Sequence, residues 1–309
     1  MSQKIIYLDQ YAWINLAQAY FGKNKDIDAI RLCEKVINAS ESNDAIFPLS
    51  LNHLIETRNE LNPKRRERLI EFMSYVSKGY TIVPFSCTTD AEIRNAILRR
   101  LGFCTINIKD FVIRKGISHM FGGRPKITGD MPESVKNLII EWLDNPEIFE
   151  ESLRRLVDVN KKKSYIDKIK ELEDERSWYA SVVNDKQRRH KFVLARNLIS
   201  VLSPKIVEIC IELNVSISIF KNWTDWVNFI KEIPTFYVPF SLSYSSERDL
   251  EKSITINDIF DVSHLSIAIP YCDIVLPDKQ FAHFAKQEVL DKIYPAIILS
   301  SIMELEEHI

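Results

Sequence analysis

The 309-residue sequence predicts an α/β fold: a parallel sheet flanked by helices and interrupted by a large, mostly helical insertion. Two observations support this prediction. Short apolar segments alternate with helical ones in residues 1–84 and again in residues 251–309, the order typical of a parallel sheet covered by helices. Residues 85–250 have helical periodicity and lack regularly spaced strand signals. We therefore expect the two terminal portions to form one sheet, with the middle portion inserted between them.

The first portion contains three segments with the β-branched and aromatic composition of buried strands. They are KIIYLD (residues 4–9), DAIFPLS (44–50) and YTIVPF (80–85). Apolar residues recur at helical spacing between them, and Pro63 suits the first turn of the helix that precedes the third strand. The alternation indicates strands that run in the same direction.

The second portion resumes the same alternation. The segment DIFDVSHLSIAIPY (258–271) is predicted as an amphipathic helix and CDIVL (272–276) as a short strand. A helix over 277–290 and a final strand over 292–300 follow, with a short acidic helical tail.

The middle portion contains a predicted loop and a local excess of positive charge. Residues 116–134 hold four of the seven glycines, so a loop is expected there. Between Arg154 and Lys205 there are 14 Lys and Arg residues against 7 Asp and Glu. This stretch is either a solvated helical face or a phosphate-binding surface with aromatic residues for stacking. The candidate nucleic-acid-binding residues are Lys161, Lys162, Lys163, Arg188, Arg189 and Lys191.

Composition excludes several classes of protein. A net charge of −2 gives no general attraction to nucleic acid, so any such surface must be local. The five cysteines form no CxxC pair, which argues against a zinc site or a disulfide framework and fits a cytoplasmic setting. No signal peptide or membrane span is predicted. The glycine-rich nucleotide loops and the GxSxG and HExxH motifs are also missing.

Four carboxylates are predicted at one edge of the sheet. Asp9 ends the first strand, and Glu56 lies in the first turns of the helix after the second strand. Asp261 lies in the first turn of the helix 258–271, and Asp278 follows the strand 272–276. Ligands of open parallel sheets bind outside the carboxyl ends of the strands. Clustered carboxylates repel one another unless cations neutralise them, and Mg²⁺ or Mn²⁺ prefer oxygen ligands. The four residues are therefore our candidate metal and catalytic residues.

Each carboxylate also has a simpler interpretation as a helix cap, a turn residue or a partner in a surface ion pair. For Asp258 we favour a cap, and we interpret Asp273 as a strand-start residue near the site. His264 and His53, each one turn from a candidate carboxylate, are interpreted as packed structural histidines.

These segments resemble the PIN-domain nucleases over residues 3–84 and 256–300. IIYLDQYAWINLA is similar to the opening strand and helix of that family, and SLNHLIE matches its Ser-plus-six-to-Glu pattern. DVSHLSIA and CDIVLPDKQF resemble the third motif and the closing acidic turn. The resemblance implies a parallel sheet with helices on both sides and a metal site formed by Asp9, Glu56, Asp261 and Asp278. The long helical insertion is not part of the minimal family domain.

We expect a nuclease dependent on Mg²⁺ or Mn²⁺ that hydrolyses phosphodiester bonds, an endoribonuclease in preference to a DNA-cleaving enzyme, with a toxin or phage-defence role suggested by the family. A small-phosphate hydrolase is one alternative. A degenerate module that binds nucleic acid or a protein partner is another. Gln10 and Tyr11 replace the small hydroxyl residue usual after the first aspartate, and Pro277 replaces a threonine, which keeps the degenerate module open. The sequence also leaves open whether the chain forms homo-oligomers and whether a protein partner or inhibitor binds it.

Overall fold

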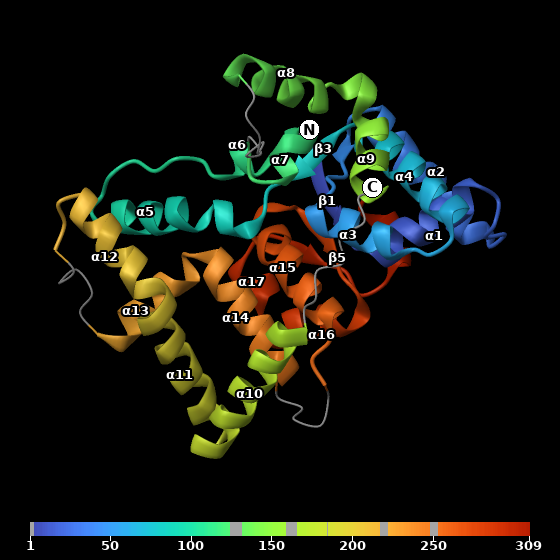
Figure 1. Cartoon of the computed structure of the whole chain (residues 1–309). Coiled ribbons are helices and arrows are strands. Elements are labelled where there is room, and N and C mark those ends of the chain that lie inside the picture. Colours follow the sequence, from blue (N-terminus) through green and yellow to red (C-terminus); the bar gives the residue numbers. More distant parts are fainter. Residues whose placement is uncertain (1–2, 124–131, 159–165, 184, 217–221, 248–252) are drawn as a thin grey trace.

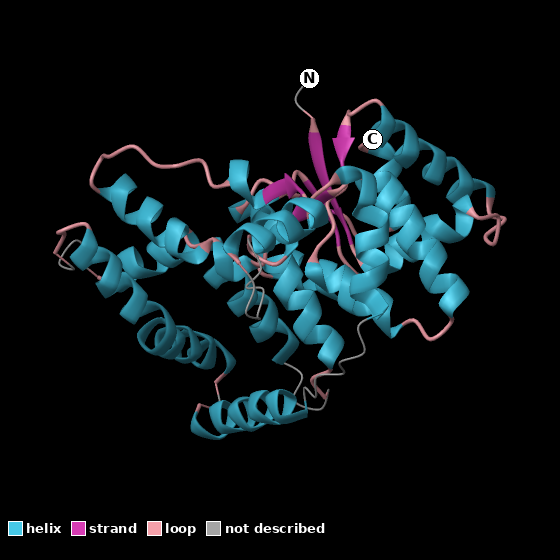
Figure 2. Ribbon diagram, turned by 45° about the horizontal axis from the view of Figure 1, so that its top comes forward, coloured by secondary structure: helices cyan, strands magenta, loops and turns pink. Residues whose placement is uncertain are grey.

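The computed structural model contains a four-stranded parallel sheet that takes two strands from each end of the chain (Figures 1 and 2). Residues 3–123, 132–158, 166–183, 185–216, 222–247 and 253–309 are described. The strand order is β2–β1–β5–β6. Ile6 and Leu8 of β1 lie opposite Ile274 and Leu276 of β5. The prediction of one parallel sheet shared by both ends of the chain is confirmed. The strands are β1 (Lys4–Leu8), β2 (Ala45–Ile46), β5 (Ile274–Leu276) and β6 (Ile297–Ile298).

The third predicted strand is only loosely connected to this sheet. β3 (Tyr80–Ile82) pairs antiparallel with β4 (Ile113–Lys115), which the sequence did not indicate. One parallel bridge, between Leu49 and Thr81, connects this pair to the segment after β2. The bridge consists of two hydrogen bonds, from the Leu49 amide to the Tyr80 carbonyl and from the Ile82 amide to the Leu49 carbonyl, both 2.9 Å long. Placing β3 fully within the parallel sheet was therefore wrong.

Side chains of the central strands alternate between two cores, one on each face of the sheet. Ile6 and Leu8 belong to the core beneath the N-terminal helices, whereas Tyr7 and Val275 belong to the core beneath the C-terminal ones. This alternation follows from the two-residue period of a strand. The N-terminal helices are α1 (Gln10–Tyr20), α2 (Ile27–Glu41), α3 (Leu51–Asn59) and α4 (Pro63–Ser77). The helices over the second core are α14 (Pro234–Glu247) from the middle portion, and α15 (Ile256–Tyr271), α16 (Lys279–Gln287) and α17 (Leu290–Ile293) from the C-terminal portion.

The middle of the chain is mostly helical and packs against elements from both ends. α9 packs against α3 and α4, and α14 packs along α15. The described residues of the predicted loop include a short helix, α7 (Ile117–Met120), while 124–131 lie outside the described part. The remaining helices are α5 (Thr89–Arg100), α6 (Lys109–Val112), α8 (Glu133–Leu143), α9 (Phe149–Asp158), α10 (Ile166–Val182), α11 (Lys186–Asn197), α12 (Ser203–Glu212) and α13 (Trp223–Lys231).

One buried carboxylate connects the middle of the chain to the C-terminal core. Glu92 on α5 accepts hydrogen bonds from the Thr88 hydroxyl, from the amide and hydroxyl of Thr235, and from the Tyr271 hydroxyl at 2.6–3.0 Å. Burial is the main cause that raises its pKa, and the hydrogen bonds oppose the rise. The domain boundaries at 84 and 250 stay a prediction.

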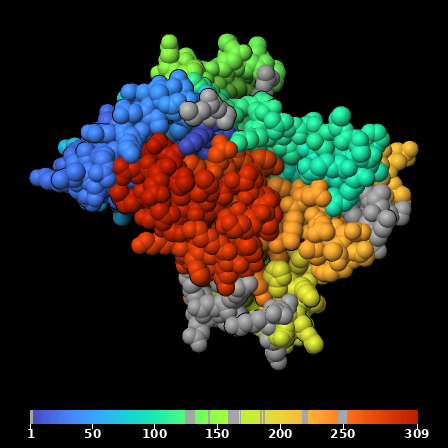
Figure 3. Space-filling model, turned by 180° about the vertical axis from the view of Figure 1, so that it is seen from behind, coloured from blue at the N-terminus to red at the C-terminus, as the bar shows by residue number. Residues whose placement is uncertain are grey.

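The surface places the two ends of the chain side by side, with residues from the C-terminal portion against those of the N-terminal portion (Figure 3). No helix formed by the described residues has both the length and the apolar character needed to cross a bilayer.

Candidate metal centre

Two of the four predicted carboxylates cap helices at the carboxyl ends of neighbouring strands. Asp9 directly follows β1 and caps α1, where its Oδ1 accepts from the Gln10 amide at 2.6 Å. Asp278 follows β5 and caps α16, accepting from the Phe281 amide at 2.7 Å. Because β1 and β5 are adjacent and parallel, their carboxyl ends bring these two aspartates to the same edge. Each of these two aspartates can therefore cap its helix and also belong to the predicted site.

The other two carboxylates lie in the second turns of helices whose first turns are fixed by capping boxes. Ser50 and His53 form the capping box of α3, which carries Glu56. Thr255 and Asp258 form the capping box of α15, which carries Asp261. The N-cap is thus Thr255, and Asp258 has a capping role as its partner inside the first turn, where Oδ2 accepts from the amide of Thr255 at 2.8 Å.

Neighbouring carboxylates add to the effect of burial in raising the pKa of Asp9, Glu56 and Asp261. The pKa of Asp261 rises to about 9, mainly through burial and then through the charges of Asp9, Asp278 and Glu56. Burial, followed by the charge of Asp9, raises the pKa of Glu56 to about 8. The pKa of Asp9 rises to about 6 through burial, partly opposed by the Gln10 amide, and the charge of Asp278 adds to the rise. The sheet edge therefore crowds buried carboxyl groups that oppose one another's ionisation, because the cluster contains no cationic side chain to neutralise them.

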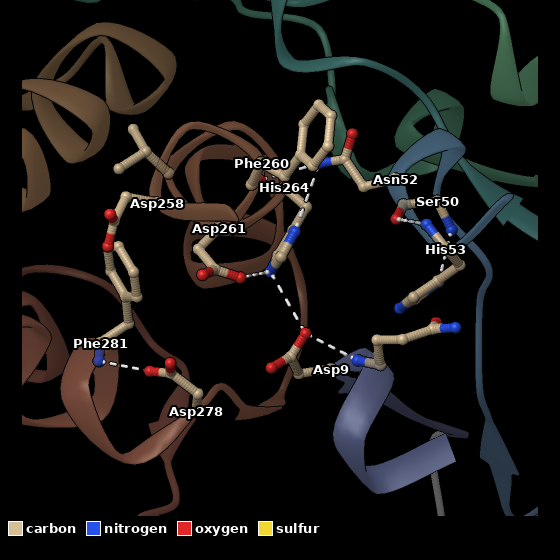
Figure 4. A network of polar contacts seen from close by, with 12 residues as sticks. Asp9, Ser50, Asn52, His53, Asp258, Phe260, Asp261, His264, Asp278 and Phe281 are labelled. Carbon is tan, nitrogen blue, oxygen red and sulfur yellow. Dashed lines mark hydrogen bonds and ion pairs between the residues drawn. The ribbon is translucent and has the colours of Figure 1, made fainter. Parts of the chain in front are cut away.

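His264 completes this cluster (Figure 4). Its Nε2 lies 3.8 Å from Oδ1 of Asp9 and 3.7 Å from Oδ1 of Asp261, and its side chain is 1% exposed. Nε2 has no hydrogen-bond partner among the described residues. Burial, assisted by the neighbouring His53, lowers the pKa of His264 to about 3, so the imidazole is neutral. Nδ1 lies near the Phe260 carbonyl and 3.3 Å from the side-chain nitrogen of Asn52, which itself donates to that carbonyl at 2.8 Å. In the tautomer whose ring proton resides on Nδ1 and points to Phe260, the lone pair of Nε2 lies between two carboxylates.

The interpretation of His264 as only a packed histidine was therefore incomplete. The side chain is packed, but its free nitrogen faces the carboxylates. Its position three residues after Asp261 places both on one face of α15. That spacing was the signal in the sequence, and it could not by itself distinguish a ligand from a core residue.

His53 has the structural role that the sequence suggested. Its Nδ1 accepts from the Ser50 amide at 3.0 Å, so the proton is on Nε2, which donates to the carbonyl of Leu8 at 2.9 Å. Its ring stacks on Tyr7, whose other neighbour is His264. His53 thereby fixes the backbone directly before Asp9.

Asp273 lies away from the cluster, contrary to its expected position near the site. It precedes β5 and so lies at the amino end of that strand, where Oδ2 accepts from the Ile5 amide at 2.8 Å. Lys109 contacts its other oxygen at 2.7 Å. Its sequence position at a strand start was correct, but a strand start and a strand end lie at opposite edges of a parallel sheet.

The predicted nucleic-acid-binding residues are only partly described. Lys161, Lys162 and Lys163 lie outside the described residues. Arg188 and Lys191 are exposed on α11. Arg189 is half-buried, and its Nε donates to the carbonyl of Val183 at 2.9 Å. A phosphate-binding surface there stays a prediction.

The donor atoms fit a cation. One ligand atom from each of Asp9, Asp261 and His264 lies within 4.8 Å of the other two, so a single ion could contact all three. The buried, unpartnered Nε2 is otherwise costly, and coordination would satisfy it.

Comparison of the chain with models of known protein families, with curated proteins and with solved structures found no match in any of the three.

Proposed function

We propose that the protein is a PIN-like, metal-dependent nuclease that hydrolyses phosphodiester bonds, with RNA as its substrate. The observation that supports this proposal best is the free Nε2 of His264, directed between the carboxylates of Asp9 and Asp261. Two buried acids beside an unpartnered imidazole are unfavourable without a cation, and they become a coordination site with one.

Asp9, Asp261 and His264 would hold the ion, with Glu56 and Asp278 adding negative charge next to it. A divalent cation there would polarise a phosphoryl oxygen and lower the pKa of water. A nitrogen donor among oxygen donors favours Mn²⁺ over Mg²⁺, which prefers oxygen ligands alone.

The surrounding residues hold these groups in position. His53 fixes the backbone carbonyl before Asp9, and the Gln10 and Phe281 amides fix the carboxylates of Asp9 and Asp278. The neutral state of His264 leaves it available as a ligand at every physiological pH. The five cysteines are free thiols, which suits the cytoplasmic setting that we propose.

The test is cleavage of a single-stranded RNA with Mn²⁺ present. The double variant Asp9→Asn and Asp261→Asn should lose this activity while keeping the far-UV circular dichroism of the wild type. A double variant that cleaves like the wild type would refute the proposal. A wild type that hydrolyses a generic phosphate monoester but no RNA would indicate a small-phosphate hydrolase. Absence of Mn²⁺ binding at millimolar concentration would indicate a degenerate binding module.

A further inference from the structure

A groove of about 630 Å³ lies between α1 and α4, outside the cluster of carboxylates. Ile14, Ala17 and Gln18 of α1 form one wall, and Lys64, Arg65 and Arg68 of α4 form the other. The floor is apolar, with Leu69 buried beneath it and Ile14 37% exposed at its side. The groove therefore combines an apolar floor with a charged wall.

The charges in this groove are strongly unbalanced. Four cations line it, against one carboxylate, Glu60. None of the four forms an ion pair with another residue in the described part of the chain, whereas Arg31 and Lys35 on α2 both pair with Glu306. Arg68 instead lies 5.3 Å from the centre of the Phe21 ring. The four groove cations are Lys23, Lys64, Arg65 and Arg68.

Two of these cations are in a position that does not favour helix stability. Lys64 and Arg65 lie in the first turn of α4, which contains no acidic residue. The helix dipole disfavours positive charge at this end, by about 0.3–1 kcal/mol for each charge. Both side chains are exposed, so packing within the protein does not explain why positive charges stand at this end of the helix. An anionic partner bound in the groove explains them.

The groove begins one helical turn from the candidate metal centre. Ile14 is one turn beyond Gln10, which follows Asp9, and Glu60 is one turn beyond Glu56 on α3. The Gln10 side chain donates to the Thr57 hydroxyl at 2.8 Å and so joins α1 to α3 at this point. A turn advances about 5.4 Å along a helix, so a polymer bound in the groove would pass close to the carboxylates.

We propose that this groove binds the phosphodiester backbone of single-stranded RNA next to the bond that is cleaved. Lys64 and Arg65 would contact phosphates, and the apolar floor with Phe21 would face ribose or base. The inference rests on the proposed nuclease function, and it assigns substrate contacts to a surface far in sequence from the basic stretch of the middle region.

The test measures binding of a fluorescent single-stranded RNA in EDTA over 50–300 mM KCl by anisotropy. For single strands, log K falls with log salt by about 0.7 per phosphate contact, so Lys64→Gln with Arg65→Gln should reduce the slope by about 1.4. We expect at least about 10-fold weaker binding at 100 mM KCl. Arg31→Gln with Lys35→Gln removes the same charge from α2 and should change neither quantity.

A groove variant with the slope and affinity of the control variant would overturn the inference, as would a wild type that does not bind RNA. Mn²⁺ titration by calorimetry is done on the same proteins, and the groove variant should bind Mn²⁺ like the wild type. If the groove variant shows the reduced salt dependence of RNA binding but neither it nor the wild type binds Mn²⁺, the groove binds RNA and the proposed nuclease function is refuted. An unchanged slope with normal Mn²⁺ binding would refute the groove alone.

Discussion

The imidazole of His264 and the carboxylate of Asp9 face each other at 3.8 Å although they come from opposite ends of the chain. Both side chains are held in place, because Asp9 caps α1 and His264 is stacked on Tyr7 in the core. A neutral ring nitrogen and a carboxylate at this separation make no direct hydrogen bond. The space between them suits a shared ligand.

Replacement of His264 by phenylalanine tests this relationship. His264→Phe keeps an aromatic ring against Tyr7 but removes the donor nitrogen, so we expect the affinity for Mn²⁺ to fall at least about 10-fold. Calorimetric titration measures it. His283→Ala removes an exposed histidine from α16 and should bind Mn²⁺ like the wild type. Equal affinity in both variants would exclude His264 as a ligand.

Without metal, the protein should become less stable as the pH rises from 6 to 9. The folded-state pKa values of Asp9, Glu56 and Asp261 lie at about 6, 8 and 9, above their ordinary values. Groups with raised folded-state pKa values stabilise the fold at low pH, and this contribution is lost as each ionises within the folded protein. We expect the Tm in EDTA to fall by at least about 5 °C over this range.

Asp261→Asn provides the matched control for that pH dependence. It removes the group with the highest of these pKa values, so its Tm in EDTA at pH 9 should exceed that of the wild type. Saturating Mn²⁺ should raise the Tm of the wild type at pH 9 but not that of the variant. If the Tm of the wild type in EDTA rose with pH, the conclusion that these carboxyl groups are buried and repel one another would be wrong.

Asp278 combines a cap with a charge, and two substitutions separate these roles. Asn is as good a cap as Asp, so Asp278→Asn should keep the Tm within about 2 °C while lowering Mn²⁺-dependent activity. Asp278→Ala loses the acceptor for the Phe281 amide and should cost about 1 kcal/mol in addition. Equal activity of the wild type and Asp278→Asn would restrict Asp278 to the cap.

Glu92 should stabilise the fold without affecting the metal. Glu92→Ala leaves the hydrogen-bond donors of Thr235 and Tyr271 unsatisfied, so we expect a loss of about 3 kcal/mol in the free energy of unfolding by urea. Its affinity for Mn²⁺ should equal that of the wild type. Glu212→Ala, which removes an exposed partner of Arg94, should cost less than about 1 kcal/mol.

The sequence indicated the sheet and much of the cluster because both depend on local patterns. Asp9 and Asp278 follow apolar strands directly, and strands of one sheet end at one edge. The antiparallel pair β3–β4 was missed because β4 has only three residues, and its pairing depends on contacts distant in sequence. No spacing rule could predict the direction of the His264 ring either, since it contacts Tyr7, His53 and Asn52, which all belong to other elements.

The groove between α1 and α4 was missed for a related reason. Its cations come from a turn after α1 and from the first two turns of α4, and only packing brings them together. The run KRRER (residues 64–68) is visible in the sequence, but nothing local to it indicates which of its charges face α1.

The order β2–β1–β5–β6 has a consequence for synthesis of the protein. β1 is translated before the whole middle of the chain, whereas its neighbour on one side, β5, is translated after it. Until then β1 has an open edge, and Asp9 and Glu56 lack Asp261 and His264. A nascent chain, or one truncated by a premature stop codon, therefore cannot assemble the cluster. Any activity that depends on the cluster therefore begins only after α15 and β5 have been translated.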